Sequence, residues 1–251
     1  MKFPAETSQP QQQAPQAAVP PPPPRLLQAG EVLSYVQAVY ERIYVNPVWV
    51  RRLDRNSVVR ALLFLNDRRM MKAYLDKIKP AGKVWMLAHV YGDLVKQVAA
   101  KVGPAGQLWL CDATPIQVAR AKSKLAHAPQ AGVWHADAAC FSPPGAPDLI
   151  CSFFLLHEVP EEKKREIVDN VLRHLSAHGG EALFVDYHNP SWWQPVRYIL
   201  LAVNRWLEPF SGALWKNAIS SYASHPDDFV WEKRTLFANV YQMVTVRRKP
   251  D

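Results

Sequence analysis

Apolar residues recur along most of the chain in two alternating patterns. Five short apolar runs of strand length lie at residues 84–88, 108–111, 132–135, 149–155 and 182–185. Three of these runs are followed by longer segments with helical apolar spacing, at residues 94–102, 115–125 and 160–175. Strands that alternate with helices are joined by right-handed crossovers, so the pattern predicts a parallel sheet covered by helices on both faces.

The pattern changes after residue 186. Residues 191–210 have the spacing of one helix, and residues 229–237 and 240–247 have the spacing of two closely connected strands. The second of these strands alternates as an antiparallel hairpin does. We therefore predict an α/β fold with a mostly parallel, seven-stranded sheet that ends in an antiparallel hairpin.

Two helices are predicted before the sheet. Residues 31–43 have apolar positions at helical spacing, and residues 57–78 form a longer helical pattern. Ser57 is a suitable N-cap for the second helix, and Pro80 with Gly82 would end it. The sequence therefore predicts an N-terminal helical extension over residues 25–80.

The first 24 residues differ from the rest of the chain because they are rich in Pro, Gln and Ala. Such a composition cannot bury enough apolar surface to offset the entropy of ordering, so we predict a disordered tail over residues 1–24. Residues 81–251 then form the sheet domain, with a helical lid at residues 191–215. The chain has 251 residues, which suits one domain with extensions.

The charge and the cysteine content of the chain limit the kinds of partner and of structural site that can be expected. The net charge is +8, and Arg51, Arg52 and Arg55 follow the apolar stretch 48–50. Aromatic residues beside Arg suit an anionic membrane surface as well as nucleic acid, but no nucleic-acid motif accompanies them, so we expect no nucleic-acid partner. Three Cys at unrelated spacings predict neither a disulfide framework nor a zinc site. The tail has no secretory or transit pattern, which indicates the cytoplasm.

Acidic residues follow the predicted strands, at the sheet edge where ligands of parallel α/β proteins bind. Asp93 follows the first turn and could equally be the N-cap of the next helix. Asp112 ends the second strand, where an acid can hold a ribose hydroxyl pair, and Thr114 is the better cap there. Asp137 follows the third strand and, taken alone, would be a plain turn residue.

Histidines accompany the acids at the last two parallel strands. His157 and Glu158 end an apolar run, where a loop His with satisfied hydrogen bonds is the alternative. Asp186 and His188 leave a buried strand at a spacing of two, which packing explains poorly. Carboxylates and imidazoles at one sheet edge suit Mn²⁺ or Mg²⁺, so Asp93, His157, Asp186 and His188 are the candidate metal ligands, with Glu158 beside them.

Three segments, LWLCDATPIQVARAKSKL, WHADAACF and DLICSFFLLHEV, resemble the second, third and fourth strand motifs of class I S-adenosylmethionine-dependent methyltransferases. The resemblance covers roughly residues 79–248 and implies a Rossmann-like fold. The first motif departs from that family. Where the family has an acid and three glycines at alternate positions, this chain has Met86, Ala88, Val90 and Gly92. Glycine permits close approach of the turn to the methionyl part of the cofactor, so this departure disfavours ordinary methyl transfer.

HVYGDL, SFFLLHEVP, VDYH and RWLEPFSGALW together resemble the rhodoquinone biosynthesis family of methyltransferase relatives. That resemblance implies conversion of ubiquinone to rhodoquinone, with S-adenosylmethionine as the amino donor and Mn²⁺ as the metal. Asp93, His157 and Tyr91 are the implied catalytic residues. The implied cofactor-binding residues are Ala88, Val90, Tyr91, Gly92, Asp112, Ala113, Asp137, Ala138 and Phe154.

A ubiquinone-modifying enzyme must reach the bilayer. The segment 191–215 is rich in Trp and aliphatic residues, with Trp192, Trp193 and Ile199 on a broad apolar face and Gln194 on the polar side. The segment is too short and too charged to span a membrane. A lid packed on the sheet and an interfacial helix explain it equally well. We expect a peripheral protein on the cytoplasmic side of the inner membrane, or on the matrix side in a mitochondrion.

Two other functions remain open from the sequence. One is a methyltransferase that acts on a quinone or a phenol. The other is a non-catalytic member of the fold that binds a partner or a lipid, for which the acids at the strand ends would be dispensable.

Overall fold

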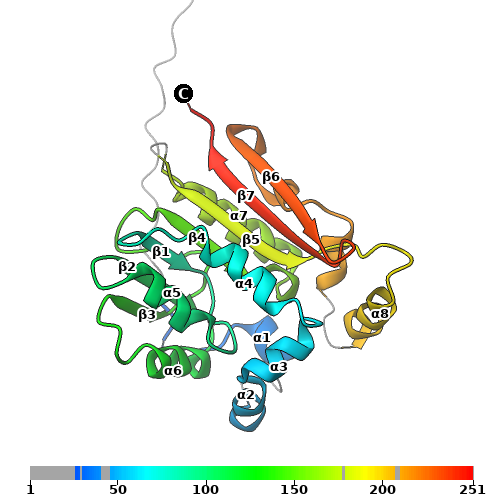
Figure 1. The fold of residues 1–251 in the computed structure, drawn as a ribbon, viewed down its shortest axis with the longest axis horizontal. Coiled ribbons are helices and arrows are strands. Elements are labelled where there is room, and N and C mark those ends of the chain that lie inside the picture. The colour runs from blue at the N-terminus through cyan, green and yellow to red at the C-terminus, as the bar shows by residue number, and fades with distance from the viewer. Residues whose placement is uncertain (1–25, 29, 41–45, 177–178, 207–209, 251) are drawn as a thin grey trace, which may run out of the picture.

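The computed structural model describes residues 26–28, 30–40, 46–176, 179–206 and 210–250 (Figure 1). The tail predicted to be disordered, residues 1–24, lies outside the described residues. A seven-stranded sheet in the order β3-β2-β1-β4-β5-β7-β6 forms the centre of the fold. The strands are β1 (Lys83–Met86), β2 (Gln107–Asp112), β3 (Ala131–His135), β4 (Leu149–Phe153), β5 (Glu181–Tyr187), β6 (Phe229–Leu236) and β7 (Tyr241–Arg248).

The first five strands are parallel, and β7 pairs antiparallel with both β5 and β6. The predicted mostly parallel sheet with a closing hairpin is therefore confirmed. The order reverses between β1 and β4, and in open parallel sheets such a switch point opens a crevice at the carboxyl ends of the strands.

Side chains of β1 alternate between two apolar cores, one on each face of the sheet, because successive strand residues point to opposite sides. Val84 and Met86 pack in one core with residues of α4 (Asp67–Leu75) and α5 (Leu94–Val102). Trp85 packs in the other core with residues of α7 (Glu161–Arg173). On the β2–β3 side, α6 (Pro115–Lys124) contacts both strands. Helices therefore cover both faces, as predicted.

The described residues before β1 form four short helices: α1 (Ser34–Tyr40), α2 (Pro47–Leu53), α3 (Asn56–Leu62) and α4. The prediction of one helix over residues 57–78 is wrong, because a turn interrupts the helix between α3 and α4. Phe64 and Leu65 there adopt φ values of 47° and 64°. Helical apolar spacing continues across the break, so the pattern alone does not reveal it.

Helix α2 was not predicted because seven residues are too few for a clear period. Local signals explain its start. The Asn46 side-chain oxygen accepts hydrogen bonds from the backbone N–H groups of Val48 and Trp49, at 3.0 and 3.4 Å, and Pro47 occupies the first turn. Such capping satisfies donors that the first helical turn leaves unpaired.

The predicted helix 191–210 is shorter in the structure, where α8 (Val196–Trp206) begins after Pro195. Residues 207–209 are not described, and 3-10 turns follow at η3 (Ser211–Trp215), η4 (Ile219–Tyr222) and η5 (Pro226–Asp228). Trp192, Trp193 and Gln194 therefore precede the helix, and the predicted polar side is wrong at Gln194, which is buried; Trp192 and Trp193 are exposed. Among the described helices, none is long and apolar enough to cross a membrane.

Candidate active site

A cavity of about 590 Å³ opens at the carboxyl ends of β1, β2 and β4. Its walls come from the strand ends and from the N-terminal helices, because Tyr35 of α1, Trp49 of α2 and Leu62 of α3 all line it. Val203 of α8 adds a further side. The volume lies in the range of pockets that hold small ligands, so this crevice is the candidate site.

Nine of the predicted site residues line this pocket: Ala88, Val90, Tyr91, Asp112, Ala113, Asp137, Ala138, Phe154 and His157. They come from the turns that follow β1, β2, β3 and β4. The prediction that the strand ends converge on one crevice therefore agrees with the geometry. Four other predicted residues are not among the described residues that line it: Gly92, Asp93, Asp186 and His188.

Asp112 ties together the turns after β1 and β2. Its Oδ2 accepts a hydrogen bond from the backbone N–H of His89 at 2.9 Å, and its Oδ1 accepts from the N–H and the hydroxyl of Thr114, both at 2.8 Å. Burial raises the pKa of this carboxyl, while the hydrogen bonds act in the opposite direction. Each carboxylate oxygen has two lone pairs, so the three protein donors leave room for one more donor, such as a ligand hydroxyl.

The turn after β1 is held by the N-terminal extension. Gly92 has φ +80°, and a Cβ built there would lie 2.6 Å from Oδ1 of Asn56, at the start of α3. Asp54, which follows α2, accepts a hydrogen bond from the Gly92 N–H at 2.7 Å. The one glycine of this turn is therefore required by its packing against α3.

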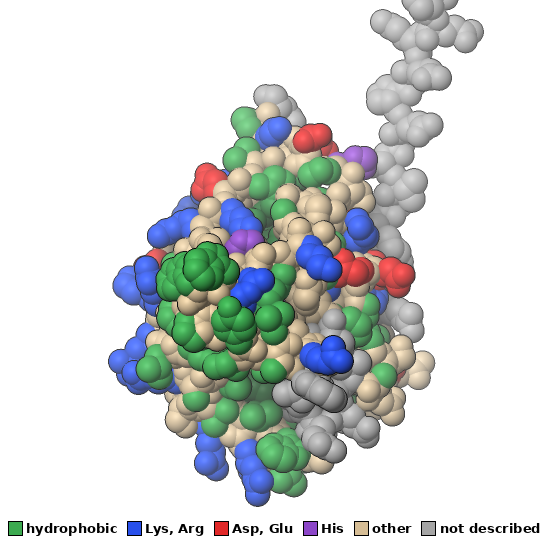
Figure 2. Space-filling view, turned by 90° about the vertical axis from the view of Figure 1, so that its right-hand side faces the viewer, with side chains coloured by type: hydrophobic (Ala, Val, Ile, Leu, Met, Phe, Trp, Pro, Cys, Tyr) green, Lys and Arg blue, Asp and Glu red, His purple; other side chains and the backbone are tan. Residues whose placement is uncertain are grey.

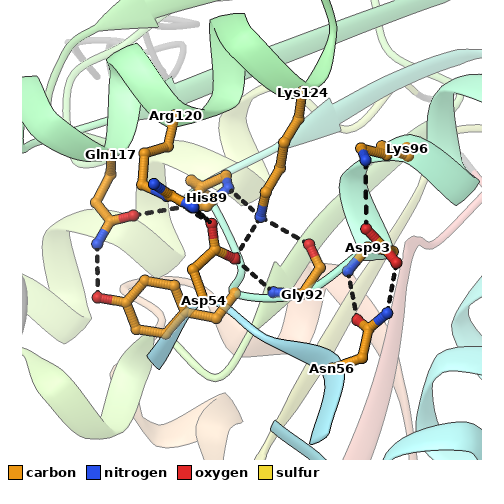
Figure 3. A network of polar contacts seen from close by, with 10 residues as sticks. Asp54, Asn56, His89, Gly92, Asp93, Lys96, Gln117, Arg120 and Lys124 are labelled. Atoms are coloured by element: carbon orange, nitrogen blue, oxygen red, sulfur yellow. Dashed lines mark hydrogen bonds and ion pairs between the residues drawn. The ribbon is translucent and has the colours of Figure 1, made fainter. Parts of the chain in front are cut away.

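The side chain of Asp54 is fully buried and lies between two cations of α6 (Figure 3). Arg120 and Lys124 both lie 2.5 Å from its carboxylate oxygens, and Lys124 also donates to the Gly92 carbonyl at 2.7 Å. These contacts hold the pKa of Asp54 below its usual range, although burial raises it. The extension, the turn and α6 are thus joined through one carboxylate.

The same network fixes His89 and Tyr91. The Lys124 ammonium lies 3.1 Å from His89 Nε2, and His89 Nδ1 lies 2.8 Å from Gln117 Oε1. Because the ammonium can only donate, Nε2 is the acceptor and Nδ1 carries the proton. Gln117 in turn donates to the Tyr91 hydroxyl at 2.9 Å. Tyr91 is consequently held at the pocket wall, and burial raises the pKa of its hydroxyl.

Asp93 is not positioned for the predicted catalytic or metal-binding role. Its carboxylate accepts from the Asn56 amide, its N–H donates to Asn56 Oδ1 at 2.9 Å, and Lys96 lies 3.5 Å away. Its side chain is more than two-fifths exposed and points toward α3 (Figure 3). Asp93 therefore fixes the turn to the extension. It makes no side-chain capping bond to α5 either.

His157 is held by Asp186 at the end of β5. It lies in the 3-10 turn η2 (Leu156–Glu158), with Nδ1 2.8 Å from Asp186 Oδ1. Asp186 also accepts from the N–H groups of Leu156 at 2.9 Å and Tyr187 at 2.8 Å. An imidazole whose Nδ1–H is bonded to a carboxylate is oriented with Nε2 as the basic atom. His157 lines the pocket, so this pair can accept a proton there.

The four predicted metal ligands do not form one cluster, although His157 and Asp186 contact each other. Asp93 is bonded to Asn56, Asp186 is used by backbone amides and His157, and His188 lies further along the chain after β5. The described part of the chain contains no group of three or more His, Cys, Asp or Glu that could hold a metal ion. These residues therefore do not fit the predicted Mn²⁺ or Mg²⁺ ion, and we assign no step to one.

Asp137, Glu158 and Tyr35 are further polar residues that line the pocket. Asp137 forms an ion pair with Lys163 at 2.8 Å and accepts from the Ala139 N–H at 2.9 Å. Tyr35 is one of the pocket residues that the sequence analysis missed, as are His89 and Gln117. Burial, followed by the negative charges of Asp137, Glu158 and Asp112, raises the pKa of Tyr35. Tyr35 lines the pocket together with these acids, although no strand-end pattern marks a residue of a helix that precedes the sheet in the sequence.

Residues 86–179, from the last residue of β1 to just before β5, match a family described as a methyltransferase domain. The structure of the mitomycin 7-O-methyltransferase MmcR superposes with a TM-score of 0.62 at 14% identity, covering 86% of this chain and 61% of that one. The N-methyltransferase NodS from Bradyrhizobium japonicum WM9, in complex with S-adenosyl-L-homocysteine, superposes with a TM-score of 0.55 at 15% identity over 85% and 98%. This is the class I methyltransferase fold.

Human N-acetylserotonin methyltransferase, in complex with S-adenosylmethionine, has the same fold, with a TM-score of 0.56 at 15% identity over 86% of this chain and 60% of that one. The chain therefore spans about three fifths of the length of MmcR and of the human enzyme. No curated protein sequence matches the chain. The predicted Rossmann-like methyltransferase fold is confirmed, and in such folds ligands bind at the strand ends that carry Asp112 and Asp137.

Replacing Asp112 by Asn should weaken cofactor binding. The amide would place an N–H₂ group against the N–H of either His89 or Thr114, and the turn would lose a charged acceptor. We expect the dissociation constant for S-adenosylhomocysteine, measured by calorimetry, to rise about tenfold. Asp148→Asn is the matched control, because Asp148 also accepts a backbone N–H, from Lys83 at 2.8 Å, but at the opposite end of β1. Equal affinities in both variants would remove Asp112 from the binding site.

The folded protein should become less stable in mild acid, because burial disfavours the protonated form of His89. Burial, and then the charge of Lys124, lower the pKa of His89 from 6.5 to about 4. The unfolded chain thus binds a proton that the folded chain refuses, so stability is complete above about pH 6.5 and falls until about pH 4. Linkage gives a loss of about 3 kcal/mol over that window. Urea unfolding of the wild type should show this slope, and His89→Gln should lack it, whereas the exposed control His127→Gln should keep it.

Proposed function

We propose that this chain binds S-adenosylmethionine in the pocket and uses it to modify the ring of ubiquinone. The observation that carries the proposal is that one pocket contains both parts of such a site. Asp112, at the end of a strand, can accept one more hydrogen bond, and an aromatic, apolar wall lies in the same pocket. The fold, shared with structures solved in complex with S-adenosylmethionine or S-adenosyl-L-homocysteine, supports the choice of cofactor.

The residues present fit the cofactor. Asp112 ends β2 and could accept a ribose hydroxyl in its remaining position. Ala88 and Val90 line the pocket beside it, and Asp137 with Ala138 line it from the turn after β3. We assign the binding of S-adenosylmethionine to this group, which includes Ala113.

The opposite wall suits a flat, apolar ring. Phe154 and Tyr187 line the pocket with their ring centres 5.1 Å apart in an edge-to-face arrangement, and His157 lies 4.9 Å from Tyr187. Phe154 adopts φ 54°, an uncommon conformation for a bulky residue, which places its ring between His157 and Tyr241. Aromatic rings stack or pack edge-on against such walls, so a quinone ring fits them.

Two reactions are compatible with this site. The methyltransferase neighbours favour transfer of a methyl group to a ring hydroxyl. The glycine-poor turn and the resemblance to the rhodoquinone biosynthesis family favour amino transfer. In that reaction the α-amine nitrogen adds to the ring carbon that bears a methoxy group, and methanol leaves. The quinone ring then takes up the electron pair of the Cα–H bond, and water hydrolyses the resulting imine, so that the bond between nitrogen and Cα breaks and an aminohydroquinone and a 2-oxo acid are formed. Bound S-adenosylmethionine would supply either its methyl group or its α-amine.

His157 has the same task in both reactions. An attacking amine or phenol must lose a proton, and His157 Nε2, with Nδ1 held by Asp186, is the base at the pocket wall. Tyr91 and Phe154 would position the ring. The reacting groups determine which bond forms, while the chain supplies orientation, proton transfer and exclusion of water.

Isotopic labelling separates the two reactions. Purified protein is incubated with a short-chain ubiquinone, or its demethylated analogue, and S-adenosylmethionine that carries a heavy methyl group and a heavy α-nitrogen. Mass spectrometry of the quinone then shows which label is transferred. The nitrogen label in a product that lacks one methoxy group supports amino transfer, and the methyl label supports methyl transfer. Parallel samples with Mn²⁺ and with a chelator test the metal predicted from the resemblance. Cofactor binding with no labelled product under any condition would favour a non-catalytic role.

A further inference from the structure

Large apolar side chains are exposed in two regions of the molecule. Nine of the eleven such side chains among the described residues belong to α2, α3 and the turn after it, or to α8 and the turn before it. We call these nine the docking face: Val48, Trp49, Leu62, Leu65, Trp192, Trp193, Tyr198, Ile199 and Leu201. Trp192 and Trp193 are 78% and 61% exposed, which is unusual for side chains of this size.

Both regions border the same pocket. Trp49 and Leu62 line it from α2 and α3, and Val203 lines it from α8. Figure 2 looks onto the side that carries α8, and hydrophobic side chains gather there and again at the lower end, where Figure 1 places α2 and α3. The docking face therefore adjoins the candidate active site, because Trp49 and Leu62 belong to both.

The helix α8 serves the pocket and the docking face with different residues. Val196 and Leu200 are buried in the core, and Val203 reaches the pocket, which fits the lid interpretation. Tyr198, Ile199 and Leu201 remain exposed on the same helix. An apolar outer face on a helix already packed by its inner face requires a second apolar environment.

The exposed charged residues of α2, of α3 and of the turn between them, which lie beside the docking face, are positive. Arg51, Arg52, Arg55 and Arg60 are exposed on and between α2 and α3, and the Arg52 guanidinium lies 5.7 Å from the ring centre of Trp49. The acid within residues 47–62 is Asp54, which is buried and paired with Arg120 and Lys124. The sequence of α8 contains no acid. Among the described residues, this surface thus combines Trp and Tyr with Arg side chains and no exposed acid on α2, α3 or α8.

We infer that the docking face binds the surface of an anionic bilayer, with the pocket entrance turned toward the lipid. Trp and Tyr favour the headgroup region, where their rings are apolar and their polar atoms remain wet, and Arg is attracted by anionic lipids. This arrangement delivers a quinone from the membrane directly into the pocket. The inference deepens the proposed function by naming the partner of that site, and it places the protein as a peripheral protein on a membrane of that charge.

Vesicle binding tests the inference without any cofactor or quinone, so it can fail while the proposed chemistry succeeds, or the reverse. The full chain is mixed with vesicles of phosphatidylcholine with phosphatidylglycerol, or of phosphatidylcholine alone, and the bound fraction is measured by sedimentation. We expect binding to the anionic vesicles that weakens with added salt, and little binding to the neutral ones.

Three variants locate the surface. Trp192→Ser with Trp193→Ser, and separately Arg51→Gln with Arg52→Gln, should each reduce the partition coefficient about tenfold. Val230→Ser with Arg234→Gln is the matched control, because it removes an exposed apolar side chain and an exposed cation from the edge strand β6. Unchanged thermal unfolding would confirm that the variants fold. Equal binding by all three variants, or no binding by the wild type, would overturn the inference.

A second copy of the chain is the competing occupant of this face. Light scattering after size exclusion measures the mass of wild type and variants in solution. A dimer that the Trp192→Ser with Trp193→Ser variant converts to a monomer, together with unchanged vesicle binding, would replace the membrane by a protein interface and overturn the inference.

Discussion

Replacing His157 by Asn should reduce the turnover rate about a thousandfold, which is within the range that positioned bases contribute. Asn can still donate a hydrogen bond to Asp186, so the turn at η2 keeps its partner while the basic Nε2 is lost. The rate of product formation at saturating cofactor and quinone measures the effect. The pH profile of the turnover rate should change as well, because the variant lacks the basic atom.

His127→Asn is the control for this experiment, because His127 is exposed on the turn after α6. It should leave both the rate and the pH profile unchanged. Asp186→Asn provides an independent check of orientation: it should lower the rate with little effect on affinity for the cofactor. A His157→Asn variant with near-wild-type turnover and the same pH profile would remove His157 as the base.

Replacing Asp54 by Asn should lower the free energy of unfolding by about 4 kcal/mol, since removal of one partner leaves buried charges uncompensated. Arg120 and Lys124 both pair with this carboxylate, and Lys124 is mostly buried. The Gly92 N–H also donates to it, so the turn after β1 would lose its attachment as well. Cofactor affinity should therefore fall along with stability, although Asp54 is not among the residues that line the pocket.

Urea unfolding at neutral pH measures the loss, and Asp76→Asn is its control. Asp76 pairs with Lys72 at 2.6 Å, but both side chains are more than half exposed, so that substitution should cost about 0.5 kcal/mol or less. If Asp54→Asn is no more destabilising than Asp76→Asn, the network in Figure 3 does not hold the turn in solution.

The sheet and part of the site were predictable because their signals are local. A buried parallel strand is a continuous apolar run, and the residue at its carboxyl end marks a known edge of the sheet, which is why Asp112 of β2 is predictable. Asp137 follows the half-buried edge strand β3, whose shorter apolar run gives the same signal more weakly. The sequence does not show whether a side chain at a strand end points into the pocket or away from it. Asp93 follows the first strand too, but its carboxylate meets Asn56 outside the pocket.

The contacts made by the extension could not be predicted in this way. Asp54 and Lys124 are 70 positions apart, and no pattern on either segment indicates that they meet. Tyr35 reaches the pocket from α1, a helix whose period predicts only an apolar stripe. The break at Phe64 and Leu65 was hidden for a different reason, since neither residue is one that commonly adopts positive φ.

The attachment of Gly92 to Asp54 and Asn56 bears on how such a loop can evolve. In a self-supporting turn, the shape of the backbone is specified by the turn's own glycines, and mutations there are tightly limited. Here contacts from the N-terminal extension hold the turn in shape as well. Ala88 and Val90 can therefore occupy positions at which the class I methyltransferase motif has glycine. A larger side chain at either position changes the shape of the pocket wall directly. Substitutions there can therefore change which ligand fits the pocket without a change in the fold.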